Sequence, residues 1–270
     1  MTIQLLIATM HQDDYSLLDR INLQSEAVVI NQCDRESNNI ITVNGHKVTW
    51  IDTIERGLSR SRNMALKNAT ADLCVICDDD EVLSNNYPDM INNAYSNLPN
   101  ADLIVFNIDR IGWNEQERIF TKPGKVRRFK TYGSVHLTFR RERIYRKQIV
   151  FNTDFGAGSG KYTSAEDAIF CRSCHLKGLT MYTYPGILCS VTCEESTWFR
   201  GYDEHYFYDV GAYLSVAFPK TKHIMKWYYP LRVRKITDLT IVNIIRSINC
   251  GFIGYKKNLN YDEYLTSSIR

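Results

Sequence analysis

Four consecutive acidic residues follow an apolar run in the first third of the chain. Leu73 to Cys77 is continuously apolar, and the next four residues are Asp78, Asp79, Asp80 and Glu81. Such a run is typical of a strand buried on both faces of a parallel sheet, and open α/β sheets bind ligands where strands end. Neighbouring carboxylates repel one another unless a cation binds them or water separates them. The acids therefore indicate either a solvated turn or an oxygen-ligand site for Mg²⁺ or Mn²⁺.

A second acidic pair, Glu166 and Asp167, follows a glycine-rich segment. Residues 156–160 read Gly-Ala-Gly-Ser-Gly, a composition typical of a mobile loop. The segment is not a phosphate-binding P-loop, because Phe155 stands where that motif needs glycine. Ser164 and Asp167 fit a capping pattern, which predicts a helix from Ser164 to about Leu176. Asp167 is therefore either a cap residue or a functional carboxylate.

The elements that would position these acids alternate between strands and helices. This alternation predicts an α/β protein with a mainly parallel sheet and right-handed crossovers. A helix is also expected from about Arg56, with Gly57 at a tight entry and Ser59 as N-cap; the arginines near its start suit either a diphosphate or a solvated surface. The strands expected from apolar patterning are Ile3–Met10, Ala27–Asn31, His46–Ile51, Leu73–Cys77, Ala101–Ile108, Thr180–Tyr184 and Ile187–Val191, and the helices include Asp14–Ser25 and Tyr87–Leu98.

Composition sets the broad class of protein. The 270 residues are 44% hydrophobic and 23% charged, which suits one large α/β domain or two small ones. No apolar run approaches the ~18 residues that cross a bilayer, and no signal pattern opens the chain, so a cytoplasmic protein is expected. Two C-x-x-C pairs, Cys74/Cys77 and Cys171/Cys174, raise the alternative of zinc. Buried thiols explain them more simply, because residues three apart in a strand point to opposite faces.

Positive charge is concentrated in two segments. Residues 118–147 contain eleven Lys or Arg and a single acid, and residues 219–257 contain nine Lys or Arg and a single acid. Aromatic residues, including Trp227, accompany both segments. Such patches suit phosphate-bearing partners or an anionic membrane surface, although solvated basic faces are the alternative.

Several signals occur in an order that resembles a known family. They are Ala8-Thr9 after the first strand, Asp34 after the second, Gly-Leu-Ser-Arg-Ser-Arg-Asn at residues 57–63, Asp-Asp-Asp-Glu at 78–81, Phe-Gly-Ala-Gly at 155–158, Glu166-Asp167, and Ser-Thr-Trp-Phe at 196–199. Together they resemble a family 2 glycosyltransferase with the GT-A fold, of the type that builds bacterial surface polysaccharides. The resemblance covers residues 3 to 215. It implies a nucleotide-binding half (1–110), an acceptor half (111–215) and a basic helical C-terminal segment (216–270).

The resemblance also implies roles for individual residues. Asp78 and Asp80 would form a D-x-D element that binds Mn²⁺ or Mg²⁺, mainly through Asp80. The nucleotide would contact Thr9, Asp34, Arg62, Asp78 and Asp79. Asp167 would be the catalytic base with Glu166 beside it, and Gly158 and Trp198 would lie on the acceptor side. The D-x-D strand end and the Glu166–Asp167 helix start must then face one cleft.

The implied reaction is an inverting transfer from a nucleotide-diphosphate sugar, expected to be a UDP-sugar, to a glycan or lipid-linked acceptor. A homodimer or an anionic membrane is expected to contact the C-terminal segment, and no nucleic acid is expected as a partner. One departure is Cys193, which stands where the family often has a metal-site His; a thiol is a poor ligand for Mg²⁺ or Mn²⁺.

Two alternatives remain open on the sequence. Residues 75–83 also resemble the motif of haloacid-dehalogenase phosphohydrolases, in which Asp78 would be a nucleophile and Asp80 an acid/base. That motif normally opens its domain, whereas here several elements precede it. The second alternative is a non-catalytic subunit that binds a sugar nucleotide or glycan.

Overall fold

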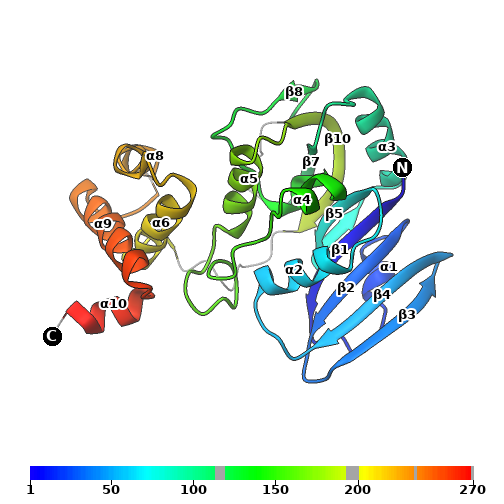
Figure 1. Ribbon diagram of the computed structural model, residues 1–270, viewed down its shortest axis with the longest axis horizontal. Helices are drawn as coiled ribbons and strands as arrows, with labels where there is room; N and C mark the ends of the chain where they lie inside the picture. Colours follow the sequence, from blue (N-terminus) through cyan, green and yellow to red (C-terminus); the bar gives the residue numbers. More distant parts are fainter. Residues whose placement is uncertain (113–118, 193–200, 234–235, 269–270) are drawn as a thin grey trace.

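A computed structural model describes residues 1–112, 119–192, 201–233 and 236–268 (Figure 1). Within this part of the chain the strands are β1 (Ile3–Met10), β2 (Glu26–Gln32), β3 (Ser37–Val43), β4 (His46–Thr53), β5 (Leu73–Asp78), β6 (Glu81–Leu83), β7 (Leu103–Ile111), β8 (Gly124–Lys125), β9 (Leu137–Arg140) and β10 (Met181–Thr192). They form one sheet in the order β3-β4-β2-β1-β5-β9-β7-β10-β6, with β8 paired to β10. Strands from both predicted halves therefore share a single sheet.

The sheet is mixed, with a parallel centre. Strands β4, β2, β1 and β5 run parallel, as do β7 and β10. Strand β9 lies between β5 and β7 and runs antiparallel to both. Because of that direction, the short 3-10 helix η1 (Ser134–His136) that precedes β9 lies near the carboxyl end of β5. The observed architecture confirms the predicted α/β fold.

Helices cover both faces of the sheet and continue beyond it (Figure 1). They are α1 (Leu17–Arg20), α2 (Leu58–Asn68), α3 (Tyr87–Asn97), α4 (Arg141–Arg146), α5 (Glu166–Leu176), α6 (Glu204–Ala217), α7 (Lys222–Met225), α8 (Tyr228–Val233), α9 (Ile241–Lys257) and α10 (Tyr261–Ser268). Buried residues of α1 and α3 share one core with one face of the sheet, and residues of α2, α4 and α5 share a second core with the other face. Burial of these apolar faces drives the layered arrangement.

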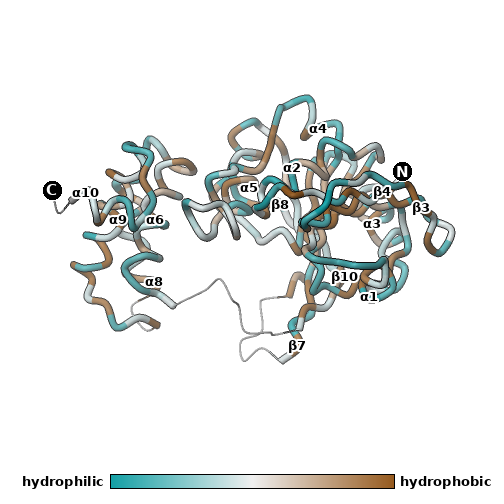
Figure 2. Tube along the Cα trace, turned by 90° about the horizontal axis from the view of Figure 1, so that it is seen from below, coloured by the Kyte–Doolittle hydropathy of each residue, from teal (hydrophilic) through white to brown (hydrophobic). Residues whose placement is uncertain are grey.

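The C-terminal helices form a third core, apart from the strands (Figure 2). Helices α6 and α9 approach closely at Gly211 and Gly251, where an added Cβ on Gly251 would overlap the backbone of Tyr208. The predicted boundary between residues 215 and 216 falls inside α6, and α6 packs with α9 in this core. The helical unit therefore begins at Glu204.

One helix prediction and one strand prediction need correction. The helix expected at Asp14–Ser25 is only the single turn Leu17–Arg20, because Asn22 adopts a left-handed conformation with φ of 60° and ends it. The two strands expected on either side of Pro185 are one strand, β10, whose register shifts between Thr183 and Ile187. A bulge lets the strand contain Pro185, which has no backbone N–H to donate to the hydrogen bonds between strands.

Strand β3 was not expected from apolar patterning. It pairs antiparallel with β4 through the Asn44-Gly45 turn, and its residues are exposed or half-buried at the edge of the sheet. Because β3 has no buried face, its sequence lacks the alternation that identifies the inner strands.

The paired cysteines occupy buried positions in the core. Cys74 and Cys77 lie in β5 and belong to the cores on opposite faces of the sheet, as residues three apart in a strand should. Cys171 and Cys174 lie in α5, and both are buried. In the described ranges, no helix combines the length and apolar character that crossing a membrane requires.

Candidate active site

The first acidic cluster lies where β5 leaves the sheet. Asp78 is the last residue of β5 and pairs in register with Ala8 of β1, so the acids project from the carboxyl edge of the parallel strands. Thr9 is buried, and its hydroxyl donates to Asp79 Oδ2 at 2.6 Å. In this arrangement Thr9 orients Asp79. Asp80 is exposed at the tip of the turn.

Asp34 follows β2 on the same edge of the sheet. Its side chain is 90% exposed, and Arg56 Nη2 donates to its Oδ1 at 2.6 Å. Asp34 is thus accessible to a ligand above the sheet, at some distance along the edge from β5 because β1 lies between the two strands.

Arg62 connects the first acidic cluster to the second. It lies on α2, and its side chain is 1% exposed. Its Nη2 donates to both oxygens of Asp78 at 2.9 Å, and its Nη1 donates to Asp167 Oδ1 at 2.7 Å and to Glu166 Oε1 at 3.2 Å. Ser134 Oγ accepts a further hydrogen bond from Nη2 at 2.8 Å. The guanidinium of Arg62, for which the resemblance implies a nucleotide contact, is thus enclosed by carboxylates.

The cluster contains more negative charge than Arg62 can balance. Asp78, Glu166 and Asp167 all contact one guanidinium. Burial and, after it, the nearby charge of Asp167 raise the pKa of Glu166 to about 7 against the opposing pull of Arg62. Near neutral pH, Glu166 is therefore partly protonated, which relieves the excess negative charge.

This pKa makes the stability of the fold depend on pH. The ordinary pKa of a glutamate is 4.5, so between 4.5 and about 7 the folded protein holds a proton that the unfolded chain releases. The resulting stabilisation is fully present below pH 4.5 and is lost as the pH rises through 7. A shift of this size corresponds to roughly 3 kcal/mol.

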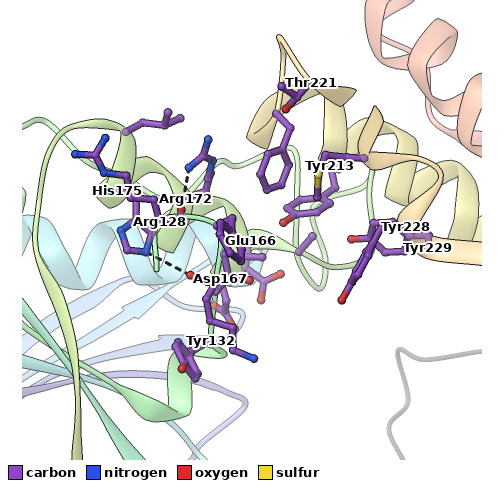
Figure 3. A pocket seen from close by; sticks show the side chains of 18 of the residues that line it. Arg128, Tyr132, Glu166, Asp167, Arg172, His175, Tyr213, Thr221, Tyr228 and Tyr229 are labelled. Carbon is purple, nitrogen blue, oxygen red and sulfur yellow. Dashed lines mark hydrogen bonds between the residues drawn. The ribbon is translucent and has the colours of Figure 1, made fainter. Parts of the chain in front are cut away.

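Asp167 lies between two cavities. The smaller, of about 220 Å³, is also lined by Asp78 and Asp80, and the larger, of about 1300 Å³, runs between α5 and the C-terminal helices. Figure 3 shows Asp167 and Glu166 at the inner end of the larger cavity. Asp167 Oδ2 accepts a hydrogen bond from Ser134 N at 2.9 Å, which fixes the carboxylate where the cavities meet. The structure thus brings Asp80 and Asp167 to one cavity, as the order of the motifs predicts.

The larger cavity has a polar and aromatic lining. Figure 3 shows Tyr132, Tyr213, Tyr228 and Tyr229 around it, together with Arg128, Arg172 and His175. Aromatic faces with a few placed polar groups are typical of sites for organic ligands. The volume of this cavity, about 1300 Å³, suits a molecule larger than a monosaccharide.

The last acid of the run, Glu81, does not face the cavity as a free carboxylate. It is buried, and its Oε1 accepts a hydrogen bond from Asp78 N at 3.0 Å. Burial, followed by the charge of Asp78, raises the pKa of Glu81 well above its ordinary value. Glu81 therefore holds the turn through its hydrogen bond with Asp78 N, and its raised pKa favours the neutral form over a fourth adjacent carboxylate.

Two helix caps differ from the sequence prediction. Helix α2 begins after Gly57, which has a φ of 115°, and Ser59 lies inside the helix with its hydroxyl donating to Phe155 O at 2.7 Å. Helix α5 begins after Ala165, which has a φ of 81°, so Ser164 does not cap it. Both caps use a left-handed residue, whose identity local sequence patterns do not reveal.

The glycine-rich segment packs against α2 and α5. A Cβ on Gly57 would lie 3.1 Å from Gly158 O, and one on Gly156 would lie 3.1 Å from Glu166 Cδ. Leu58 N also donates to Ala157 O at 2.9 Å. Gly158, expected on the acceptor side, is not among the residues that line either cavity. Gly158 lies against Gly57 at the start of α2, the helix that carries Arg62, whereas Gly156 is the glycine that lies against Glu166. The predicted residues Trp198 and Cys193 lie outside the described residues.

The acids fit a divalent ion that arrives with its ligand. No three His, Cys, Asp or Glu side chains in the described ranges form a group that could hold a metal. Asp80 is exposed to the small cavity, whereas Asp78 already shares its charge with Arg62. Mg²⁺ commonly takes one or two protein carboxylates, with phosphate oxygens and water completing its shell. Asp80 and Asp78 suit that mode of binding.

Sequence and structure comparisons identify relatives of this site and fold. Residues 15–159 match the family described as Glycosyl transferase family 2. The structure of S. aureus TarS 1-349 in complex with UDP is 13% identical, with a TM-score of 0.63 over 97% of this chain and 93% of that chain. The complex of TarS 1-349 with UDP-GlcNAc is 16% identical, with a TM-score of 0.59 over 100% of this chain and 76% of that chain. No curated protein sequence matches the chain.

The family match covers more than half of the chain and includes both Arg62 and the acids that follow β5. At this low identity, the structural likeness shows the fold alone. It covers 97% of the chain and so includes the C-terminal helices, which lie beyond the family match. The chain therefore belongs to glycosyl transferase family 2 and has the GT-A fold.

Proposed function

We propose that this protein is an inverting glycosyltransferase that moves a sugar from a UDP-sugar to a hydroxyl group of a glycan or lipid-linked acceptor. The observation that carries the proposal is the location of Asp167, which lines both the small cavity with Asp80 and the large cavity beyond it. A donor and an acceptor in these cavities would meet at its carboxylate. UDP is favoured because the similar TarS structures hold UDP and UDP-GlcNAc. A role in surface polysaccharide synthesis, at the cytoplasmic face of the membrane, is part of the proposal.

The proposed reaction forms one bond and breaks another at the anomeric carbon. The acceptor oxygen attacks from the face opposite the diphosphate, the bond to the diphosphate breaks, and Asp167 takes the acceptor's proton. A divalent ion held by Asp80 and Asp78 would offset the charge that builds on the leaving diphosphate. Asp34 and Asp79 would contact the nucleoside, with Thr9 orienting Asp79.

Asp80 provides the test of donor binding. The variant Asp80→Asn is expected to lose at least about tenfold in UDP affinity with Mn²⁺ present, because it removes a charged ligand of the metal. Calorimetric titration of UDP, with and without EDTA, measures this loss, and Asp13→Asn on an exposed loop is the control. Equal UDP binding by wild type and Asp80→Asn would contradict the metal-assisted site.

The phosphohydrolase alternative finds less support in the geometry. Both oxygens of Asp78 accept hydrogen bonds from Arg62, which leaves Asp78 poorly disposed as a nucleophile. Activity on simple phosphomonoesters, without UDP release from UDP-sugars, would favour that alternative.

We also propose that α7 and α8 rest on an anionic membrane. Ile224 on α7, Trp227 in the turn after it and Leu231 on α8 are 73%, 57% and 68% exposed. Lys222 and Lys226 lie close by in the chain and direct their ammonium groups to Ser215 and Asn249. Exposed Trp and aliphatic residues within a basic segment suit the membrane interface. A second copy of the chain is the alternative partner for these three exposed residues.

Vesicle flotation separates these partners. Trp227→Ser with Leu231→Ser is expected to weaken binding to phosphatidylglycerol vesicles at least about tenfold, because two apolar side chains no longer enter the interface. Ile40→Ser, at an equally exposed position on β3, is the control. Unchanged flotation, with a changed sedimentation coefficient, would indicate a dimer contact and oppose membrane binding.

A further inference from the structure

Four cations line the larger cavity together with Asp167. Arg128 and Lys130 come from the segment before η1, Arg172 comes from α5, and Arg232 comes from α8. Across the described ranges, none of these four residues forms an ion pair with a carboxylate. The lining also contains two acids, Glu166 and Asp167, both of which contact Arg62. Four cations against two acids leave the lining of the cavity with an excess of positive charge.

Neutral groups hold two of these cations in place. Arg172 Nε donates to Ala217 O and its Nη1 donates to Arg128 O, each at 2.9 Å, while its guanidinium lies 4.8 Å from the centre of the Phe218 ring. Lys130 Nζ lies 5.1 Å from the centre of the Tyr132 ring. Backbone carbonyls and rings orient the charges without cancelling them. Arg172 is therefore presented to the cavity in a fixed position.

The neighbouring histidine responds to this positive charge. His175 Nε2 lies 3.3 Å from Lys130 O, one turn along α5 from Arg172 (Figure 3). Burial lowers the pKa of His175, and the charges of Arg172 and Arg128 lower it further. The local potential is thus positive enough to disfavour an additional cation, which is the condition for anion binding.

The spacing along α5 relates this positive region to the reacting group. Arg172 follows Asp167 by five residues, which is roughly 7 Å along a helix axis, and His175 follows it by eight, roughly 12 Å. A ligand with a hydroxyl at Asp167 would therefore reach the cations through a different unit of its structure. Tyr213 and Tyr132 line the path between them and offer flat faces to sugar rings.

We propose that the acceptor is anionic: a glycan that carries a phosphate group on a unit neighbouring the reacting hydroxyl, held by Arg128, Lys130 and Arg172. Guanidinium groups bind phosphate through paired hydrogen bonds, and Lys130 adds a flexible point charge. The proposal rests on the proposed function, since the cavity receives an acceptor only if Asp167 is the base.

Direct binding tests the proposal. The probes are a mannose oligosaccharide carrying one phosphate monoester and the same oligosaccharide after phosphatase treatment. Each is titrated into the full chain with UDP and Mn²⁺ at saturation, so that the donor site is closed to the phosphate. The phosphorylated probe is expected to bind at least about tenfold more tightly than the neutral one. Raising the salt concentration should reduce that difference.

Two double variants locate the binding. Arg128→Gln with Lys130→Gln is expected to remove the preference for the phosphorylated probe. Lys256→Gln with Lys257→Gln changes the net charge equally, at exposed positions on α9, and is expected to keep the preference. Equal binding of the two probes by wild type, or equal losses in both double variants, would overturn the proposal. A lipid-binding result would also overturn the proposal. In that case the protein would bind phosphatidylglycerol vesicles through Arg128 and Lys130 but would not bind the soluble phosphorylated probe. The cations would then serve a lipid headgroup.

Failure of this proposal is distinguishable from failure of the proposed function. If the protein binds UDP in an Asp80-dependent manner but does not distinguish the two probes, the transferase assignment stands and the acceptor is neutral. If UDP does not bind, the donor site itself is wrong.

Discussion

Replacing Arg62 with glutamine is expected to lower the free energy of unfolding by about 3–5 kcal/mol. The guanidinium is enclosed by Asp78, Glu166 and Asp167, at nitrogen–oxygen distances between 2.7 and 3.2 Å. Removing one partner of a buried ionic cluster leaves uncompensated charge, which costs far more than losing an exposed ion pair. The Asp78 end of β5 and the start of α5 would then repel each other. Urea unfolding, followed by fluorescence, measures the change in stability.

Two further variants define the cause of that loss. Arg60→Gln removes an arginine from the same helix, but Arg60 is 38% exposed on its side chain and lies 3.6 Å from Glu55, so a change within about 1 kcal/mol is expected. Arg62→Lys keeps the charge but cannot reach both sides of the cluster with one ammonium, so it should fall between glutamine and wild type. If Arg62→Gln unfolds at the same urea concentration as wild type, Arg62 does not hold the two acidic clusters together.

The sequence predicts the position of the D-x-D acids well, for a physical reason. A strand buried on both faces has to be continuously apolar, and residues 73–77 are all apolar. Ligands gather at the carboxyl ends of such strands, so acids at that point indicate a site before any contact is known. The same logic locates Asp34 after β2. At both positions the local pattern predicts where the strand ends and its acid begins.

The contacts of Arg62 could not be predicted in the same way. Its partners Ser134 and Asp167 are 72 and 105 residues away in the chain. They meet because β9 enters the sheet antiparallel between β5 and β7, which brings Ser134 to the end of β5. No local pattern announces that insertion, since β9 is only four residues long. The sequence motif at residues 57–63 points to Arg62, but the carboxylates that enclose its guanidinium are brought together only by the topology of the sheet.

Glu81 shows a different limit of local patterns. Hydropathy alone would bury Val82 and expose its acidic neighbour, yet Glu81 and Leu83 are buried while Val82 is 47% exposed. The pairing of β6 with β10 sets this alternation, because successive side chains of a strand face opposite sides. The buried carboxyl accepts a hydrogen bond from Asp78 N, and burial raises its pKa, which favours its neutral form.

Changing Asp167 to asparagine is expected to reduce kcat by about 10²- to 10⁴-fold, because the acceptor hydroxyl loses the group that takes its proton. UDP affinity should stay within about threefold of wild type, since Asp80 and Asp78 are unchanged. Both oxygens of Asp167 accept hydrogen bonds, from Arg62 and from Ser134 N, and asparagine can satisfy only one of them. A loss of about 1–3 kcal/mol in stability is therefore also expected. Release of UDP from UDP-sugars, with Mn²⁺ present, measures turnover.

Glu166→Gln is the comparison that assigns the base. It keeps Asp167 and its two hydrogen bonds, so its loss in kcat should stay below about tenfold. It also removes the carboxyl whose pKa burial raises to about 7, so its stability should fall less than that of wild type between pH 5 and pH 8. If Glu166→Gln loses more turnover than Asp167→Asn, the base is the ionised form of Glu166, and Asp167 is the neighbouring charge that raises its pKa. If UDP binds to wild type and to both variants alike but none of the three releases UDP from UDP-sugars, the chain is a sugar-nucleotide-binding subunit.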